Sequence, residues 1–459
     1  MDNKQLLHRK SVLFADSLSG YTQARNNFFN EVNELWCSGK EDKAVSWVKD
    51  MYIDAQSFLT EWKLDRWLDK EEKAGLISEC EAFLKSHNAD EALSEANDEV
   101  ADIKSCKLAE VSRMTLAGKM NVYWGHDKCD EIDYSLRRGA SFTTSNPGKV
   151  NTYRKQFPNE WAKMLAEAKN EYEIKNETEL LSVMTMKTVA MMARHTQPVC
   201  EATDGQYGFS SIQVSPKNWN DAEAMEREIV FWYEAFKKEL GTETPNITFK
   251  VPATPAAVIA AAKVRTKYAR LRVCATSNFS TRQHMEFYKA LENRDPAALL
   301  VIVDVHLRTY SKPEFEAMGV DDPEKYCKLL VSMVYRRCYE LLKQNGLNIQ
   351  INGAGIRDAE GVRNNFTTDM SLPVTLTIMP EVVKDFNEHP QALTDAMHDK
   401  VSEADMEILN RSKIFRQAYY AEEFPWDDIR SFPPYCLMMD KFEEAYDENL
   451  ASLKEAMKG

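Results

Sequence analysis

Between Met120 and Ile378 the sequence alternates short apolar runs with amphipathic segments, and this alternation restricts the fold more than any other feature. The apolar runs are Met120–Trp124, Ala140–Thr143, Phe209–Val214, Asn246–Val251, Leu271–Ala275, Leu299–Val305, Asn348–Asn352 and Val374–Ile378. Segments with helical spacing of apolar residues separate them, for example Glu160–Lys175, Asp221–Leu240, Pro255–Arg265, Thr281–Glu292 and Tyr326–Asn345. Strands that alternate with helices predict a parallel sheet covered by helices. Eight such strands fit a closed (β/α)8 TIM barrel, with a doubly wound open sheet as the alternative.

The regions on either side of this alternation are predicted to be helical. Residues 1–117 place apolar residues at three- and four-residue spacing between charges and contain almost no Gly or Pro. We expect a helical extension over 1–117, a barrel over 118–395 and a helical tail over 396–459 that packs on the side of the barrel, with a tail that covers the barrel mouth as the alternative. The extension would dock on the barrel or on a second copy of the chain, which leaves a homo-oligomer open. A separate domain with its own partner is the alternative.

Composition excludes several classes of partner. The net charge of −14 argues against broad contact with nucleic acid or anionic membranes, although a local pair of arginines can still hold one phosphate. No run approaches the ~20 apolar residues of a membrane span, and Met1–Lys10 has no apolar core of signal-peptide length. The 9 cysteines are scattered singly, with no Cys-x-x-Cys pair. Reduced thiols in a cytoplasmic protein explain this better than a disulfide framework.

Polar residues follow nearly every predicted strand, where the loops of a barrel converge on one mouth. In order they are Asp127, Thr143–Pro147, Gln213–Pro216, Lys250–Thr254, Thr276–Ser280, Arg308, Gly353–Arg357 and Thr377–Pro380. Lys250 stands out because it lies in an otherwise apolar strand, Ile247–Val251. Burial there disfavours the ammonium form, and a neutral amine is what a Schiff-base nucleophile needs. The alternative is a lysine whose charge reaches water or a carboxylate.

The order of these motifs resembles the transaldolase family, which includes the fructose-6-phosphate aldolases. The resemblance extends from about Met120 to Glu388 and leaves out the helical extension and most of the tail. It implies a (β/α)8 barrel in which Lys250 forms a Schiff base with a sugar phosphate substrate, without a cofactor.

Asp127 matches the acid–base aspartate of that family. Cleavage of a carbon–carbon bond next to a Schiff base requires removal of a hydroxyl proton, so a carboxylate within reach is expected. Asp130 and Asp133 are rivals in the same loop. A metal site made of His126, Cys129 and Asp130 is another reading, but no second ligand cluster at a defined spacing supports it, and we expect no metal.

Five further residues are assigned to substrate binding through the resemblance. Asn146 and Thr144 correspond to the turn that contacts substrate hydroxyls, although an asparagine before proline is also ordinary turn chemistry. Arg308 and Arg357 resemble the two arginines that hold the sugar phosphate, since a guanidinium fork matches phosphate oxygens. Gly355 stands where the family often carries a serine.

Other positions depart from the family pattern. Gln213 replaces the glutamate with which most transaldolases handle the catalytic water, and the aldolase branch also has glutamine there. Cys274 replaces a second asparagine, whereas Thr276 is retained. We count Gln213 and Thr276 among the catalytic residues.

The sixth strand departs further, because Val303 and Val305 replace a serine and an aromatic residue. Asp304 and His306 lie beside them. A carboxylate near a phosphate pocket would repel the phosphate, unless Asp304 points outward and pairs with Arg308. The sequence does not decide whether Asp304 and His306 face the site.

The expected function is transfer of a three-carbon ketol unit between phosphorylated sugars. One alternative is cleavage of a ketose phosphate by an aldolase-like reaction. Another is a barrel that has lost catalysis and acts as a scaffold, although such a protein has little reason to retain a buried amine beside an acid.

Overall fold

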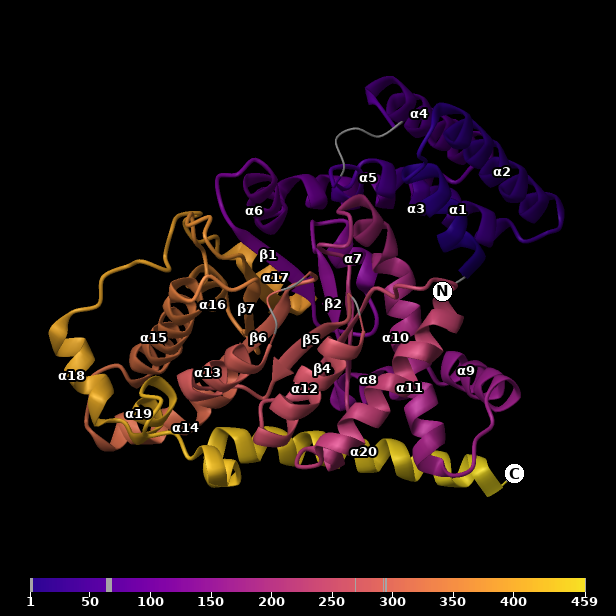
Figure 1. The fold of residues 1–459 in the computed structure, drawn as a ribbon. Coiled ribbons are helices and arrows are strands. Elements are labelled where there is room, and N and C mark those ends of the chain that lie inside the picture. Colours follow the sequence, from indigo (N-terminus) through magenta and orange to yellow (C-terminus); the bar gives the residue numbers. More distant parts are fainter. Residues whose placement is uncertain (1–2, 63–67, 269, 292, 294, 459) are drawn as a thin grey trace.

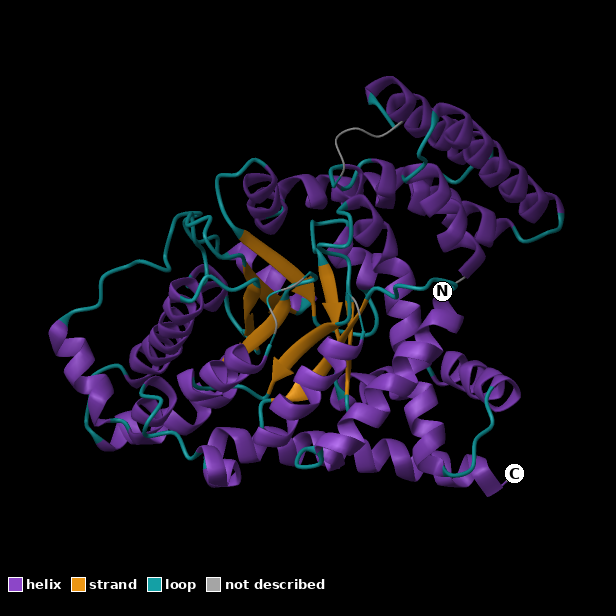
Figure 2. Ribbon diagram, viewed as in Figure 1, coloured by secondary structure: helices purple, strands orange, loops and turns teal. Residues whose placement is uncertain are grey.

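The computed structural model describes residues 3–62, 68–268, 270–291, 293 and 295–458, and its centre is a closed barrel of parallel strands (Figures 1 and 2). The strands are β1 Val122–His126, β2 Phe142–Thr144, β3 Ser210–Gln213, β4 Ile247–Pro252, β5 Arg272–Thr276, β6 Ala298–Val303, β7 Ile349–Ala354 and β8 Val374–Ile378. Each strand pairs with the next in sequence, and β1 closes the barrel against β8. The predicted TIM barrel is confirmed, and the doubly wound open sheet is excluded.

Each expected apolar run overlaps one strand, because strands covered on both faces are apolar nearly throughout. β1 extends two residues beyond its expected end, through Gly125 and His126. Because glycine is depleted in strands, the predicted strand stopped before Gly125. Gly125 has a packing reason: a Cβ there would lie 2.4 Å from the ring of Phe142 on β2.

Helices surround the barrel on all sides (Figure 2). They are α7 Ile132–Leu136, α8 Pro147–Gln156, α9 Pro158–Glu171, α10 Glu177–Ala202, α11 Ala222–Leu240, α12 Pro255–Lys267, α13 Thr281–Ala290, α14 Asp304–Ala317, α15 Pro323–Gln344, α16 Ala359–Arg363 and α17 Pro380–Glu388, with a 3-10 turn η2 Pro216–Asn218. Many begin at a side-chain cap; the Asp221 carboxylate, for example, accepts from the backbone N–H of Ala224 at the start of α11.

The N-terminal helices form a second layer above the barrel (Figure 1). They are α1 Asn3–Leu13, α2 Leu18–Cys37, α3 Glu41–Ala55, α4 Lys70–Ser86, α5 Asp90–Ser105 and α6 Lys107–Leu116, with a 3-10 turn η1 Phe58–Thr60. Helices α1–α5 bury apolar side chains in a core of their own, whereas η1 and α6 contribute to the core of the barrel.

Buried ion pairs fasten the extension to the barrel of its own chain. Asp54 on α3 lies 2.7 Å from the guanidinium groups of both Arg9 on α1 and Arg137, which follows α7. Arg9 also lies 2.9 Å from Asp133. Removing one member would leave a buried charge without its partner, which is costly. The extension is therefore held against the barrel by side-chain contacts as well as by the covalent connection of the chain.

The C-terminal helices lie along one edge and the mouth of the barrel. They are α18 Glu403–Arg411, α19 Lys413–Tyr419, the 3-10 segment η3 Trp426–Ser431 and α20 Pro433–Lys458. Figure 1 shows α20 running across the side toward which the strands point, and its residues Met438 and Phe442 line the same cavity as Lys250. Of the two placements that the sequence leaves open for the tail, the structure has α20 over the mouth.

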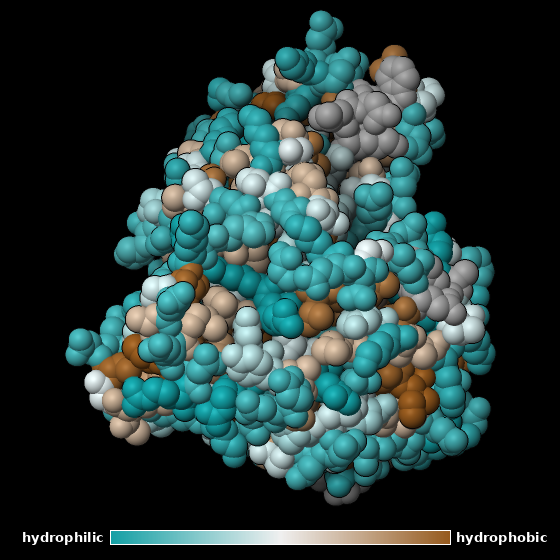
Figure 3. Space-filling model, turned by 60° about the vertical axis from the view of Figure 1, so that its left-hand side comes forward, coloured by the Kyte–Doolittle hydropathy of each residue, from teal (hydrophilic) through white to brown (hydrophobic). Residues whose placement is uncertain are grey.

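The surface is predominantly hydrophilic on the face shown in Figure 3, with hydrophobic side chains scattered among polar ones. Among the described helices, none combines the length and the apolar character that a crossing of the bilayer requires.

Candidate active site

A cavity of about 130 Å³ opens at the carboxyl ends of the strands, beneath α20. Seven of the nine predicted site residues line it: Asp127, Thr144, Asn146, Lys250, Thr276, Gly355 and Arg357. They come from β2, β4, β5 and the loops after β1, β2 and β7. The topology of the barrel thus brings together residues that lie more than 200 positions apart in the sequence.

Lys250 is the only one of these residues with a buried amine. It lies in β4, its exposed fraction is 8%, and its Nζ donates a hydrogen bond of 3.0 Å to the backbone carbonyl of Ser145. No carboxylate among the described residues is within ion-pair distance of this amine. Lys250 is therefore held in position by a neutral acceptor.

Asp127 is positioned by contacts on both carboxylate oxygens. The Thr144 hydroxyl donates to Oδ1 at 2.8 Å, and Nζ of Lys149 lies 3.6 Å from Oδ2. Lys149 is in the first turn of α8 and also lines the cavity. We did not predict it, although its place three residues after Asn146 put it at the mouth.

The two rival acids have other surroundings. Asp133 belongs to the ion-pair cluster under the extension and also accepts from Nδ1 of His195 at 2.7 Å. Asp130 does not line the cavity, and burial raises the pKa of its carboxyl. Asp127 is therefore the one acid of this loop that faces the amine-bearing cavity.

His126 fixes the loop that carries Asp127 and leaves no ring nitrogen for a metal. Its Nε2 donates to the Asp130 carbonyl at 2.6 Å, and its Nδ1 therefore accepts from the Ser135 hydroxyl at 2.8 Å. Among the described residues, no group of three or more His, Cys, Asp and Glu side chains is arranged to hold a metal ion. The metal reading of this loop has no support in the geometry.

Burial lowers the pKa of His126 to about 4, so we expect stability to fall as the pH drops from 6.5. In that range a histidine of the unfolded chain takes up a proton while His126 does not, which favours unfolding by about 2 kcal/mol at pH 5. Denaturant unfolding of wild type and His126→Gln at pH 7.5 and pH 5 measures this. The advantage of the wild type over the variant should shrink at pH 5; an unchanged difference contradicts the assignment.

Two hydrogen bonds of the β2–α8 turn bear on the site. Asn146 Oδ1 accepts from the backbone N–H of Lys149 at 3.0 Å, so this asparagine is a helix cap as well as a cavity residue. The backbone carbonyl of Ser145 accepts the hydrogen bond from Lys250. A backbone acceptor of this kind has no signature in the sequence.

Arg357 and His306 form the opposite wall. The Arg357 guanidinium donates to the Ile356 carbonyl at 3.2 Å, and no carboxylate of the described residues is within ion-pair distance of it. Burial and the charges of Lys441 and Arg357 lower the pKa of His306 to about 4, so its imidazole is neutral near pH 7. Gly355 has φ +70, and a Cβ there would lie 3.3 Å from Val303 and Val305. Arg357 is thus a cation of this wall that has no carboxylate partner among the described residues and can contact an anion.

The expected role of Arg308 in binding the sugar phosphate is not supported by its position. This arginine does not line the cavity with Lys250; its Nη2 donates to Asp304 at 2.9 Å and its Nη1 to Asp358 at 2.8 Å, in a separate small cavity beside α14 and α15. The four-residue spacing of Asp304 and Arg308 makes them neighbours on the helix that begins at Asp304. Asp304 thus points away from the mouth, which removes its conflict with a phosphate.

Gln213 is placed beside Lys250 in the register of β3 and β4 but lines a neighbouring cavity, not this one. Its Oε1 is buried and has no hydrogen-bond partner among the described residues. Thr276 lies at the end of β5 and does line the cavity. The expected direct contact of Gln213 with the amine-bearing cavity is therefore not seen.

The chain matches one family of known proteins. A family model described as transaldolase/fructose-6-phosphate aldolase matches residues 129–433, about two thirds of the chain. The matched range begins just after Asp127 and includes β2 to β8. A search of curated proteins found no match. On the family match and the closed barrel together, the chain belongs to the transaldolase/fructose-6-phosphate aldolase family.

Proposed function

We propose that this protein is a Schiff-base enzyme that transfers a three-carbon ketol unit from a ketose phosphate to an aldehyde acceptor. The observation that supports it most is the buried Lys250 amine, which faces the same cavity as Asp127 and has no counter-ion within the described structure. The Ser145 carbonyl aims the amine, and the Asp127 carboxylate is held by Thr144 and Lys149.

In the proposed reaction, the neutral Lys250 amine attacks the ketose carbonyl, and loss of water gives a protonated imine. Asp127 removes the proton from the C4 hydroxyl while the C3–C4 bond breaks, and the electron pair moves into the imine to form an enamine. The aldehyde leaves. The enamine then attacks a second aldehyde, whose oxygen takes the proton back from Asp127. Addition of water to the new imine releases the product ketose and the free amine.

The aldolase outcome remains the second candidate, because Gln213 cannot accept a proton from water as a glutamate can. Both outcomes share the first half of the reaction. They differ in whether a new ketose forms only when an acceptor aldose phosphate is added. Product analysis with and without erythrose 4-phosphate distinguishes them: ketose transfer supports transaldolase, and dihydroxyacetone release without acceptor supports the aldolase.

Borohydride trapping tests the shared step. Incubation with fructose 6-phosphate and sodium borohydride should reduce the imine to a stable secondary amine and add one three-carbon unit to the chain. Peptide mapping should locate it on Lys250. Absence of an adduct, or an adduct on another lysine, would remove the basis of the proposal and favour a non-catalytic barrel.

Arg357 is proposed to bind the substrate phosphate, and Arg357→Gln should raise KM for fructose 6-phosphate. Loss of a hydrogen-bonded charge pair weakens binding by about 1.5–3 kcal/mol, or about 10- to 100-fold. KM for unphosphorylated fructose should change little. Arg308→Gln is the matched control, because that arginine lies outside the cavity: its melting temperature should fall, while the ratio of the two KM values stays as in wild type. The opposite pattern would return the phosphate contact to Arg308.

A further inference from the structure

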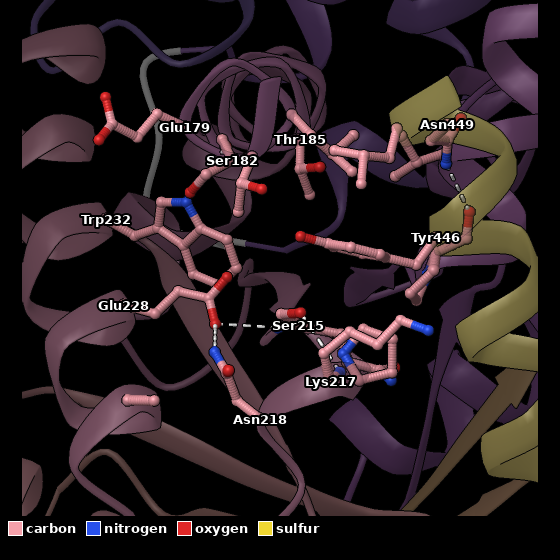
Figure 4. Close-up of a pocket in the computed structure, with 18 of the residues that line it drawn as sticks. Glu179, Ser182, Thr185, Ser215, Lys217, Asn218, Glu228, Trp232, Tyr446 and Asn449 are labelled. Atoms are coloured by element: carbon pink, nitrogen blue, oxygen red, sulfur yellow. Dashed lines mark hydrogen bonds between the residues drawn. The ribbon is translucent and has the colours of Figure 1, made fainter. Parts of the chain in front are cut away.

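A second cavity of about 650 Å³ lies beside the mouth, between α8, α10, α11, η2 and α20 (Figure 4). Its size is within the ~300–1,000 Å³ range of small-molecule sites, whereas the cavity at Lys250 is smaller. Asn146 lines both cavities, and Ser145 and Gln213 line the second. The second cavity therefore reaches the residue whose carbonyl holds the Lys250 amine.

A carboxyl group without a cation faces this cavity. Glu228 on α11 accepts hydrogen bonds from the Ser215 backbone N–H at 2.9 Å and from Asn218 Nδ2 at 3.2 Å, as Figure 4 shows. No lysine, arginine or histidine of the described residues lies within ion-pair distance of it. Burial raises the pKa of Glu228 to about 7. Near pH 7 this group can both accept and donate hydrogen bonds.

Hydroxyl groups line the wall opposite Glu228. Figure 4 shows Ser182 and Thr185 on α10 and Tyr446 on α20 arranged around the hollow. Neither the Ser182 nor the Thr185 hydroxyl donates or accepts a hydrogen bond within the described part of the chain. Gln213, 4% exposed, adds a buried Oε1 that has no partner among the described residues. A buried acceptor is rarely left unpaired, so Gln213 indicates a polar ligand, and the Ser182 and Thr185 hydroxyls are placed to bind the same ligand.

The charges around this cavity argue against a phosphate as that ligand. Lys217 at the rim is already paired with Asp447 at 2.8 Å, and Arg227 is paired with Glu223 at 3.7 Å. In its ionised form Glu228, which has no cation within ion-pair distance among the described residues, would repel an anion. What remains is a set of neutral donors and acceptors around one carboxyl group, and vicinal hydroxyl groups match such a set.

We propose that this second cavity binds an uncharged, polyhydroxylated chain, the unphosphorylated part of a sugar, and delivers it to the Lys250 cavity past Asn146 and Gln213. The identification of this polyol as part of the substrate rests on the proposed function. The binding of a polyol in this cavity does not. Within this assignment, α20 closes the second cavity through Tyr446 and the first through Met438 and Phe442.

Calorimetric titration with sorbitol tests the site, because sorbitol has no carbonyl and cannot form an imine. Sorbitol should bind the full-length wild type, and inorganic phosphate should not displace it. Glu228→Gln and Thr185→Val, on two different helices, should each weaken binding, by about tenfold or more for Glu228. Lys250→Met should leave sorbitol affinity unchanged, because Lys250 does not line this cavity. Circular dichroism and melting temperature confirm that each variant folds.

The same samples separate this inference from the proposed function. If fructose 6-phosphate is trapped on Lys250 but sorbitol does not bind, or binds equally to both cavity variants, the second site is overturned and the enzyme assignment stands. If sorbitol binding depends on Glu228 and Thr185 but nothing is trapped, the site stands and the enzyme assignment falls. With both correct, sorbitol should slow trapping in the wild type and not in Glu228→Gln.

Discussion

Lys250→Met should lower kcat/KM for ketose phosphate by at least about 10⁴-fold, since removal of a covalent nucleophile takes away the whole reaction path. Methionine has a similar length and an apolar side chain, so it fits the buried end of β4 without an unpaired charge. The variant loses one hydrogen bond, from Nζ to the Ser145 carbonyl. Its fold should persist, and steady-state kinetics with a melting curve separate lost chemistry from lost structure.

Lys149→Met is the matched control for that experiment. Lys149 lies in the same cavity, but its amine is 3.6 Å from Oδ2 of Asp127, so it forms an ion pair there and is not the proposed nucleophile. Borohydride trapping should fail in Lys250→Met and succeed in Lys149→Met. The reverse result would move the nucleophile from β4 to α8 and end the assignment of Lys250.

The strands were predictable because parallel barrel strands are buried on both faces and show as short apolar runs. The polar residues at or shortly after the end of each run then mark the mouth, and the family resemblance gave Asp127 and Arg357 their expected roles beside Lys250. All three line one cavity in the structure. These positions follow from topology, because parallel strands present their carboxyl ends on one side.

Features that depend on docking were not predictable in the same way. Helical periodicity identifies α20 as a helix but does not state which surface it covers, so the sequence could not choose between the side of the barrel and its mouth. The Ser145 carbonyl that holds Lys250 is a backbone group and carries no residue signature. For Arg308 a signal was present, since an aspartate four residues earlier is a common helical ion pair, and it outweighs the resemblance.

The second expected result concerns proton transfer: Asp127→Asn should lower kcat by about 10²–10⁴-fold, the range for loss of a general acid–base group. Asparagine is isosteric and its oxygen can still accept from the Thr144 hydroxyl, so the loop should keep its conformation. What disappears is the group that removes the C4 hydroxyl proton. Imine formation needs no proton from that position, so the variant should still be trapped on Lys250 by borohydride.

Asp130→Asn supplies the control for the proton-transfer step, because Asp130 lies in the same loop but outside the cavity. Its kcat should stay within a few-fold of wild type. Single-turnover kinetics should show imine accumulation in Asp127→Asn, since the step after imine formation is slowed. A large loss of kcat in Asp130→Asn together with a normal kcat in Asp127→Asn would assign the proton transfer to Asp130 instead. Loss of trapping in Asp127→Asn would instead show that its carboxylate acts before the carbon–carbon bond breaks, in forming the imine itself.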